Sequence, residues 1–141
     1  MRFWDSSAIV PLLTAEKDSS FSEKMLKEDG NLVVWWGSRI ECLSAIARKH
    51  RAGEATEADM EAALRRLNDI ETYASMVEPE TGVRESAELL IRRHPLGAAD
   101  AFQLAAALSW SRGRPMGVDF VCLDARLGSA ARKEGFTVHP A

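Results

Sequence analysis

The chain has 141 residues, of which 46% are hydrophobic and 28% are charged, values typical of one globular domain spanning residues 1–141. No apolar stretch is close to the length of about 20 residues that a membrane helix needs. Asp5 lies where a signal peptide would have an apolar run, so we expect a cytoplasmic protein. The net charge of −3 argues against a protein that holds nucleic acid by bulk electrostatics.

Short apolar runs alternate with helical patterns along the chain, and Gly or Pro residues separate several of them. In chain order, the patterns predict a strand ending at Asp5, a helix capped by Ser6-Ser7, a strand Leu32–Trp36, a helix from Ser38 to near Gly53, a helix opening at Thr56 and reaching Ile70, a weak strand Ser75–Val77, helices Thr81–Arg93 and Ala98–Trp110, a strand Phe120–Leu123, a helix Asp124–Glu134 and an edge strand Phe136–Val138.

Strands separated by helices predict an α/β fold in which helices cover both faces of the sheet. We therefore expect a three-layer sandwich with a central, mostly parallel sheet of about five strands. In open sheets of this kind, ligands bind beyond the carboxyl ends of the strands. That rule gives the functional site an expected location before any residue is assigned to it.

Four acids fall at this predicted edge: Asp5 and Asp124 end strands, and Glu41 and Asp100 lie in the first turns of helices. Two carboxylates about 5 Å apart repel by about 3 kcal/mol at an effective dielectric of 20, so such a cluster favours a bound cation. Oxygen ligands without His or Cys suit Mg²⁺ or Mn²⁺, which generate hydroxide and shield phosphodiesters. The sequence therefore predicts metal-dependent phosphate chemistry.

Helix capping is the competing explanation for these acids. Ser38-x-x-Glu41 matches a capping box, and Asp124 could be the N-cap of the helix that follows it. Asp100 could serve the helix dipole, although it interrupts a nearly all-apolar helix. Capping explains Asp5 least, since it ends a strand.

Other polar and aromatic residues are weaker candidates. Three histidines, His50, His94 and His139, form no plausible acid–base pair, which disfavours acid–base catalysis by histidine. The two cysteines lack the spacing of a zinc site or a disulfide framework.

Basic and aromatic residues offer possible contacts to nucleic acid. Arg48, Lys49 and Arg51 form the densest basic run, which we read as a solvated helix end with RNA phosphates as the alternative partner. Three tryptophans in predicted strands are expected in the core rather than as base-stacking surfaces: Trp4, Trp35 and Trp36.

Four segments together resemble PIN-domain nucleases, especially the VapC-type toxins of bacterial toxin–antitoxin pairs. They are Phe3–Val10 (FWDSSAIV), Ser38–Ala47 (SRIECLSAIA), Ala98–Ala107 (AADAFQLAAA) and Leu123–Leu127 (LDARL), in the family's order. The resemblance implies an RNA-cleaving enzyme that binds Mg²⁺ or Mn²⁺ through Asp5, Glu41 and Asp100, with the Ser7 hydroxyl orienting Asp5 or a bound water. It also implies a homodimer and a small antitoxin that blocks the cleft.

The fourth family acid usually follows a Thr or Ser two residues earlier, and Cys122 holds that place here. Asp124 is therefore the matching acid, with Asp119 as a rival that would lie at the other end of its strand. Three alternative functions stay open: an RNA-maturation nuclease, a phosphoacceptor signalling domain and a non-catalytic scaffold. The short chain favours the toxin, and a phosphoacceptor domain would need a Lys and a Thr at strand ends.

Overall fold

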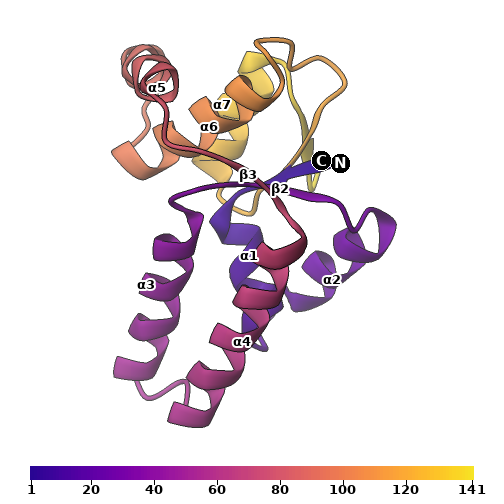
Figure 1. Cartoon of the computed structure of the whole chain (residues 1–141), viewed down its shortest axis with the longest axis vertical. Helices are drawn as coiled ribbons and strands as arrows, with labels where there is room; N and C mark the ends of the chain where they lie inside the picture. Colours follow the sequence, from indigo (N-terminus) through magenta and orange to yellow (C-terminus); the bar gives the residue numbers. More distant parts are fainter.

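The computed structural model describes residues 1–141 and contains a five-stranded parallel sheet between two layers of helices (Figure 1). The elements, in chain order, are β1 (Arg2–Trp4), α1 (Ser6–Leu13), α2 (Ser19–Glu28), β2 (Leu32–Trp35), α3 (Ser38–Arg51), α4 (Glu57–Tyr73), β3 (Ser75–Val77), α5 (Thr81–Arg93), α6 (Ala98–Trp110), β4 (Asp119–Val121), α7 (Ala125–Glu134) and β5 (Thr137–His139). The predicted fold class is confirmed. No helix combines the length and apolar character that a membrane crossing needs.

The sheet has the strand order β3-β2-β1-β4-β5, and every neighbouring pair is parallel. The chain moves outward from β1 through β2 to β3, then returns to the other side of β1 for β4 and β5. The order therefore reverses between β1 and β4, and the crevice outside the carboxyl ends of such strands is where open α/β sheets bind ligands. Asp5 and Asp124 follow these two strands.

Side-chain alternation along the strands builds two separate cores. Phe3 belongs to the core under α5–α7, whereas Trp4, the next residue, belongs to the core under α1–α4. Val33 and Val34 divide in the same way because successive strand residues point to opposite faces of a sheet. Figure 1 shows the same arrangement, with α5, α6 and α7 above the strands and α1–α4 below.

Several element ends shift by one to three residues, as in β4, which ends at Val121 rather than Leu123, and two further details differ from the predicted elements. Helix α2 was not predicted, because it buries only Ser22 and Met25 and therefore lacks a clear apolar period. The expected core position of Trp36 is wrong: β2 ends at Trp35, and the Trp36 side chain is 53% exposed. Trp4 and Trp35 are buried as expected.

Candidate active site

The four predicted acids line one cleft at the carboxyl ends of β1 and β4. This cleft has a volume of about 470 Å³, and its walls come from the start of α1, one face of α3 between Ile40 and Arg48, the start of α6 and the residue that caps α7. Its acids are Asp5, Glu41, Asp100 and Asp124. Residues separated by up to 119 positions in sequence thus meet because parallel strands bring their carboxyl ends to the same edge.

Asp5 is the most deeply buried of the four acids, with 2% of its surface exposed. Its Oδ2 accepts a hydrogen bond from the Ser7 backbone N–H at 3.0 Å, so Asp5 is also the N-cap of α1, a role that the sequence disfavoured. Its Oδ1 is buried and has no hydrogen-bond partner. Burial raises the pKa of this carboxyl to about 6, against hydrogen bonds from Ser7 that lower it.

Glu41 has a side-chain donor on each of its carboxylate oxygens. Ser6 Oγ donates to Oε1 at 2.9 Å, and Gln103 Nε2 donates to Oε2 at 2.9 Å. The expected capping box is absent, because Gly37 rather than Ser38 is the N-cap of α3. Burial first, and then the nearby Asp5 charge, raise the pKa of Glu41 to about 7.

Gln103 is a site residue that the sequence analysis missed. It is fully buried in the alanine-rich helix α6, and its Nε2 also donates to Ser38 Oγ at 2.9 Å. Its Oε1 has no hydrogen-bond partner. A buried amide in an otherwise apolar helix is unusual, and this polar interruption was the signal in the sequence. Gln103 fixes the Glu41 carboxylate toward the cleft.

Asp100 and Asp124 form the more open side of the cleft. Asp100 is half-buried in the first turn of α6 and makes no hydrogen bond. Burial, followed by the Asp124 charge, raises the pKa of Asp100, while Arg126 acts in the opposite direction. Asp124 is the N-cap of α7, with Oδ1 accepting from the Leu127 N–H at 2.8 Å, so the capping role proposed for it is real. Its second oxygen is not used by that bond.

The donor set fits a hard divalent cation. The cleft offers carboxylate and hydroxyl oxygens, one of which, Asp5 Oδ1, is buried and unpartnered, and these are the ligands that Mg²⁺ and Mn²⁺ prefer. A cation beside the cluster would also remove the repulsion that raises the Glu41 pKa. No group of three or more His, Cys, Asp or Glu side chains converges tightly enough to enclose an ion by itself. The acids therefore surround an open cleft, in which water or substrate oxygens would complete a coordination shell.

Comparison with known proteins places this geometry in a family. The model of the PIN domain family matches residues 2–112. The chain belongs to the PIN-domain family. Two curated relatives from Mycobacterium tuberculosis, Ribonuclease VapC45 (strain CDC 1551 / Oshkosh) and Ribonuclease VapC49 (strain ATCC 25618 / H37Rv), are each 33% identical to it over 148 residues, covering 99% of this chain and 94% of the relative.

Two crystal structures share the fold of this PIN domain. PAE2754 from Pyrobaculum aerophilum superposes with a TM-score of 0.66 at 20% identity and covers 97% of this chain and 87% of its own. FitAcB from Neisseria gonorrhoeae superposes with a TM-score of 0.66 at 13% identity, covering 98% and 96%. Both superpositions cover nearly the whole PIN-domain chain, so the chain shares its overall fold with these two structures.

Ser7 and Cys122 join the ends of β1 and β4 beneath the carboxylates of the PIN domain. Ser7 Oγ accepts from the Leu123 N–H at 2.9 Å and donates to Cys122 Sγ at 3.8 Å. The Cys122 thiol in turn contacts Asp5 Oδ2 at 3.8 Å and the Asp124 carbonyl at 3.3 Å. Burial raises the pKa of Cys122 well above its ordinary value, so it is a neutral thiol donor rather than a thiolate ligand.

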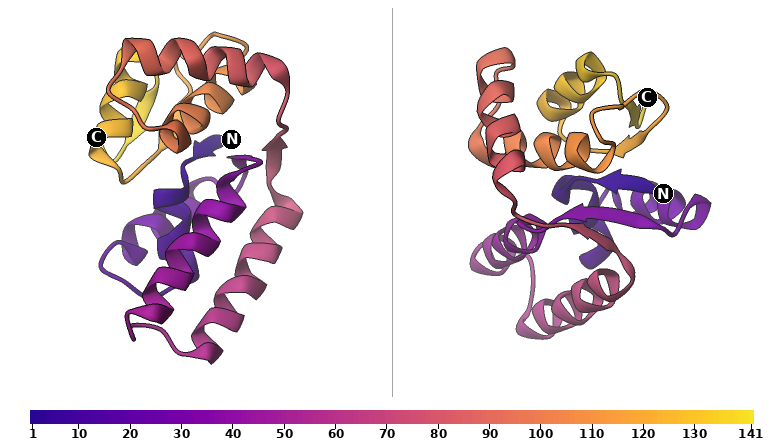
Figure 2. Two further views of the ribbon diagram at one scale, coloured as in Figure 1. Left: turned by 90° about the vertical axis from the view of Figure 1, so that its left-hand side faces the viewer. Right: turned by 45° about the horizontal axis from the view of Figure 1, so that its top comes forward.

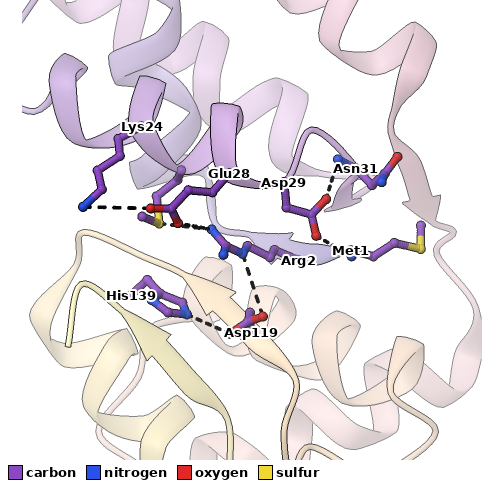
Figure 3. Close-up of polar contacts among 9 residues, drawn as sticks. Met1, Arg2, Lys24, Glu28, Asp29, Asn31, Asp119 and His139 are labelled. Carbon is purple, nitrogen blue, oxygen red and sulfur yellow. Dashed lines mark hydrogen bonds and ion pairs between the residues drawn. The ribbon is translucent and has the colours of Figure 1, made fainter.

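Asp119, the rival for the fourth acid, lies at the opposite end of β4. Its Oδ1 is 2.7 Å from His139 Nε2, and its Oδ2 is 3.8 Å from Arg2 Nε (Figure 3). Asp119 and Arg2 lie at the amino ends of β4 and β1, and the His139 side chain reaches them from the last residue of β5. The PIN domain therefore uses Asp119 in a surface ion-pair cluster, away from the carboxylate cleft.

The basic run divides between two environments. Arg48 lines the cleft and forms no ion pair with any acid of the chain. Lys49 instead forms a 2.7 Å ion pair with Glu16, and Arg51 is exposed at the end of α3. Of these three residues, the PIN domain places only Arg48 beside the acids.

Proposed function

We propose that this PIN-domain protein is a divalent-metal-dependent endoribonuclease and the toxin of a toxin–antitoxin pair. The observation that carries the proposal is the cleft at the strand-order reversal, where four acids meet and one carboxylate oxygen of Asp5 is buried without a partner. The printed names of the two curated relatives, both ribonucleases, support RNA as the substrate.

In the proposed mechanism, Asp5 and Asp100 hold the ion, with Glu41 and Asp124 as further oxygen donors. A bound Mg²⁺ or Mn²⁺ would supply activated water and shield the charge of the phosphodiester. Ser6 and Gln103 hold both oxygens of Glu41 in place. Arg48 at the cleft wall binds a phosphate next to the cut.

A phosphoacceptor domain is less well supported. Such a domain needs a Lys and a Thr beside its phosphorylated Asp, and neither residue type lines this cleft. The intact set of acids likewise disfavours a non-catalytic scaffold. We extend the proposal to a cytoplasmic homodimer whose cleft is blocked by a small antitoxin protein. Growth arrest with discrete RNA cuts on induced expression would separate a toxin from an RNA-maturation enzyme.

The proposal predicts RNA products with 5′-phosphate and 3′-hydroxyl ends. All three histidines lie outside the cleft, near Glu57, Glu134 and Asp119, so no imidazole is available for a route through the 2′-hydroxyl. Purified protein incubated with RNA and millimolar Mg²⁺ or Mn²⁺ should show this cleavage, and EDTA should stop it. Cleavage that continues in EDTA, or products with 2′,3′-cyclic phosphates, would contradict the mechanism.

Gln103→Met should weaken metal binding and cleavage about 10-fold, because residues that orient a ligand contribute at least that much. Methionine preserves the buried volume but removes the donors to Glu41 and Ser38. Mn²⁺ affinity by calorimetry and initial cleavage rates measure the effect. Ser22→Ala is the matched control, since it removes a buried 2.8 Å hydrogen bond to the Ala8 carbonyl, away from the cleft. The control should lose stability but keep its Mn²⁺ affinity, and an unchanged affinity in Gln103→Met would exclude the orienting role.

A further inference from the structure

A second cleft, which we call the aromatic cleft because three of its eight lining residues are aromatic, lies at the carboxyl ends of β2 and β3. It has a volume of about 400 Å³ and is formed by the end of β2, the β3–α5 loop, the start of α5 and one residue of α6. The left-hand view of Figure 2 looks onto this edge of the sheet, with α3 on one side and α5 and α6 on the other. No step of the proposed mechanism uses this aromatic cleft.

The aromatic cleft shares two elements with the carboxylate cleft. Gly37, in its wall, immediately precedes α3, which carries Glu41. Phe102, also in its wall, lies two residues beyond Asp100 on α6. The two clefts therefore flank the amino-terminal turns of α3 and α6. A strand of RNA whose phosphate lies at the acids would pass its neighbouring nucleotide along this edge.

The floor of the aromatic cleft is closely packed. Trp35 is 7% exposed and stacks on Phe102, with ring centroids 5.5 Å apart and planes within 4°. A Cβ atom at Gly37 would come within 2.5 Å of Trp35 Nε1, so the indole lies directly against the backbone. These two stacked rings close the inner side of the cleft and leave the exposed Trp36 as its free aromatic ring.

Trp36 stands beside this floor and is 53% exposed. Its ring lies 6.4 Å from that of Trp35 and at 71° to it. Its backbone N–H donates to the Val77 carbonyl at 3.0 Å, which fixes the residue while leaving the indole open. Large exposed aromatic surfaces on a fixed backbone are typical of binding sites.

Two side chains of opposite charge complete the wall of the aromatic cleft. Arg84 and Glu80 lie one turn apart and line the cleft, yet neither forms an ion pair or a side-chain hydrogen bond. A carboxylate can accept a hydrogen bond from the exocyclic amine of a base, and a guanidinium can bind phosphate or stack on a base. Aromatic faces combined with these two groups match a nucleotide better than an apolar peptide side chain, which would leave both charges unused.

We propose that the aromatic cleft binds one unpaired nucleobase of the RNA substrate, next to the nucleotide that is cut. Trp36 stacks on the base, Glu80 and Thr81 face its edge, and Arg84 binds the adjoining phosphate. Single-stranded RNA is commonly recognised by such stacking, which tolerates different bases and can be tuned by edge contacts. This inference rests on the proposed function and adds a subsite that selects single-stranded RNA.

The test measures RNA binding separately from cleavage. In a non-cleaving Asp100→Asn background, Trp36→Ala should raise the Kd for a labelled single-stranded oligoribonucleotide about 5- to 100-fold, and Trp36→Phe should retain most of the affinity. Titration of the parent with the oligoribonucleotide should quench tryptophan fluorescence, and Trp36→Phe should lose that quenching. Tyr73→Ala, which removes an 86% exposed ring at the end of α4, is the matched control and should change neither quantity.

An unchanged Kd in a folded Trp36→Ala protein would overturn the subsite. If that variant kept its RNA affinity but no longer bound a protein partner, the cleft would be a protein-binding surface, and the subsite would again be overturned. This failure differs from failure of the proposed function, in which the wild-type protein neither cleaves nor binds RNA. A duplex of the same sequence should bind more weakly than the single strand, and equal binding would also overturn the proposal.

Discussion

Asp100→Asn should lower RNA cleavage by at least about 100-fold while leaving the fold intact. The Asp100 carboxylate is half-buried, lines the cleft and makes no hydrogen bond, so its charge has no structural partner to lose. Asparagine keeps the shape of the side chain but removes its negative charge. Losing a residue that only orients a metal ligand costs about 10- to 100-fold, and losing the ligand itself is expected to cost more. Single-turnover cleavage rates at saturating Mg²⁺ measure the loss, and circular dichroism confirms folding.

Asp119→Asn provides the matched control. This acid also belongs to β4, but it is the first residue of that strand, where its side chain meets Arg2 at the start of β1 and the side chain of His139 from β5. Its replacement should leave the cleavage rate within about twofold of wild type, since Asp119 does not line the cleft, and any loss of stability from its partly buried ion pairs is measured separately by urea unfolding. Full activity in Asp100→Asn, or a comparable loss in Asp119→Asn, would remove the basis for the assigned cleft.

The sequence predicted the parts of the fold that depend on local patterns. Phe3-Trp4, Val33-Val34 and Phe120-Val121 are buried on both faces of their strands, and such strands appear in sequence as continuous apolar runs. The positions of Asp5 and Asp124 after two of these runs placed both acids at one edge without knowledge of the strand order. Parallel pairing alone carries that inference.

The parts that the sequence could not predict depend on contacts between distant segments. Gln103 meets Glu41 across 62 residues, so no local pattern reports their hydrogen bond. Trp36 continues the apolar run of β2 in sequence, but the strand ends at Trp35 and the Trp36 ring is exposed, which the run itself does not indicate. For Asp5, the strand end hid the N-cap role, because the next helix begins at once with Ser6.

Asp5 raises a question of stability, because a buried carboxyl with an unpartnered oxygen opposes folding when it is charged. Burial raises its pKa from an ordinary value of 3.8 to about 6. An acid with a raised folded-state pKa stabilises the native state below its unfolded-state pKa, and this contribution is lost as the pH rises through the folded-state value. Stability of the metal-free protein should therefore decline between about pH 4 and pH 7, with Glu41 acting in the same direction because its pKa is raised to about 7.

The effect of Asp5→Asn on the free energy of unfolding should therefore change sign when the metal is added. Without metal at pH 8, the variant should be more stable than wild type by about 2–3 kcal/mol, the free energy that corresponds to roughly two pKa units. With Mg²⁺ at about 100 times its dissociation constant, wild type should gain about 2.7 kcal/mol and the variant little, while cleavage by the variant is lost. Urea unfolding of both proteins with EDTA or Mg²⁺ measures the four free energies. Equal Mg²⁺ stabilisation of the two proteins would show that the ion binds elsewhere. If instead the variant is the more stable protein without metal and wild type is the more stable with Mg²⁺, the buried Asp5 carboxylate destabilises the metal-free fold and binds the cation.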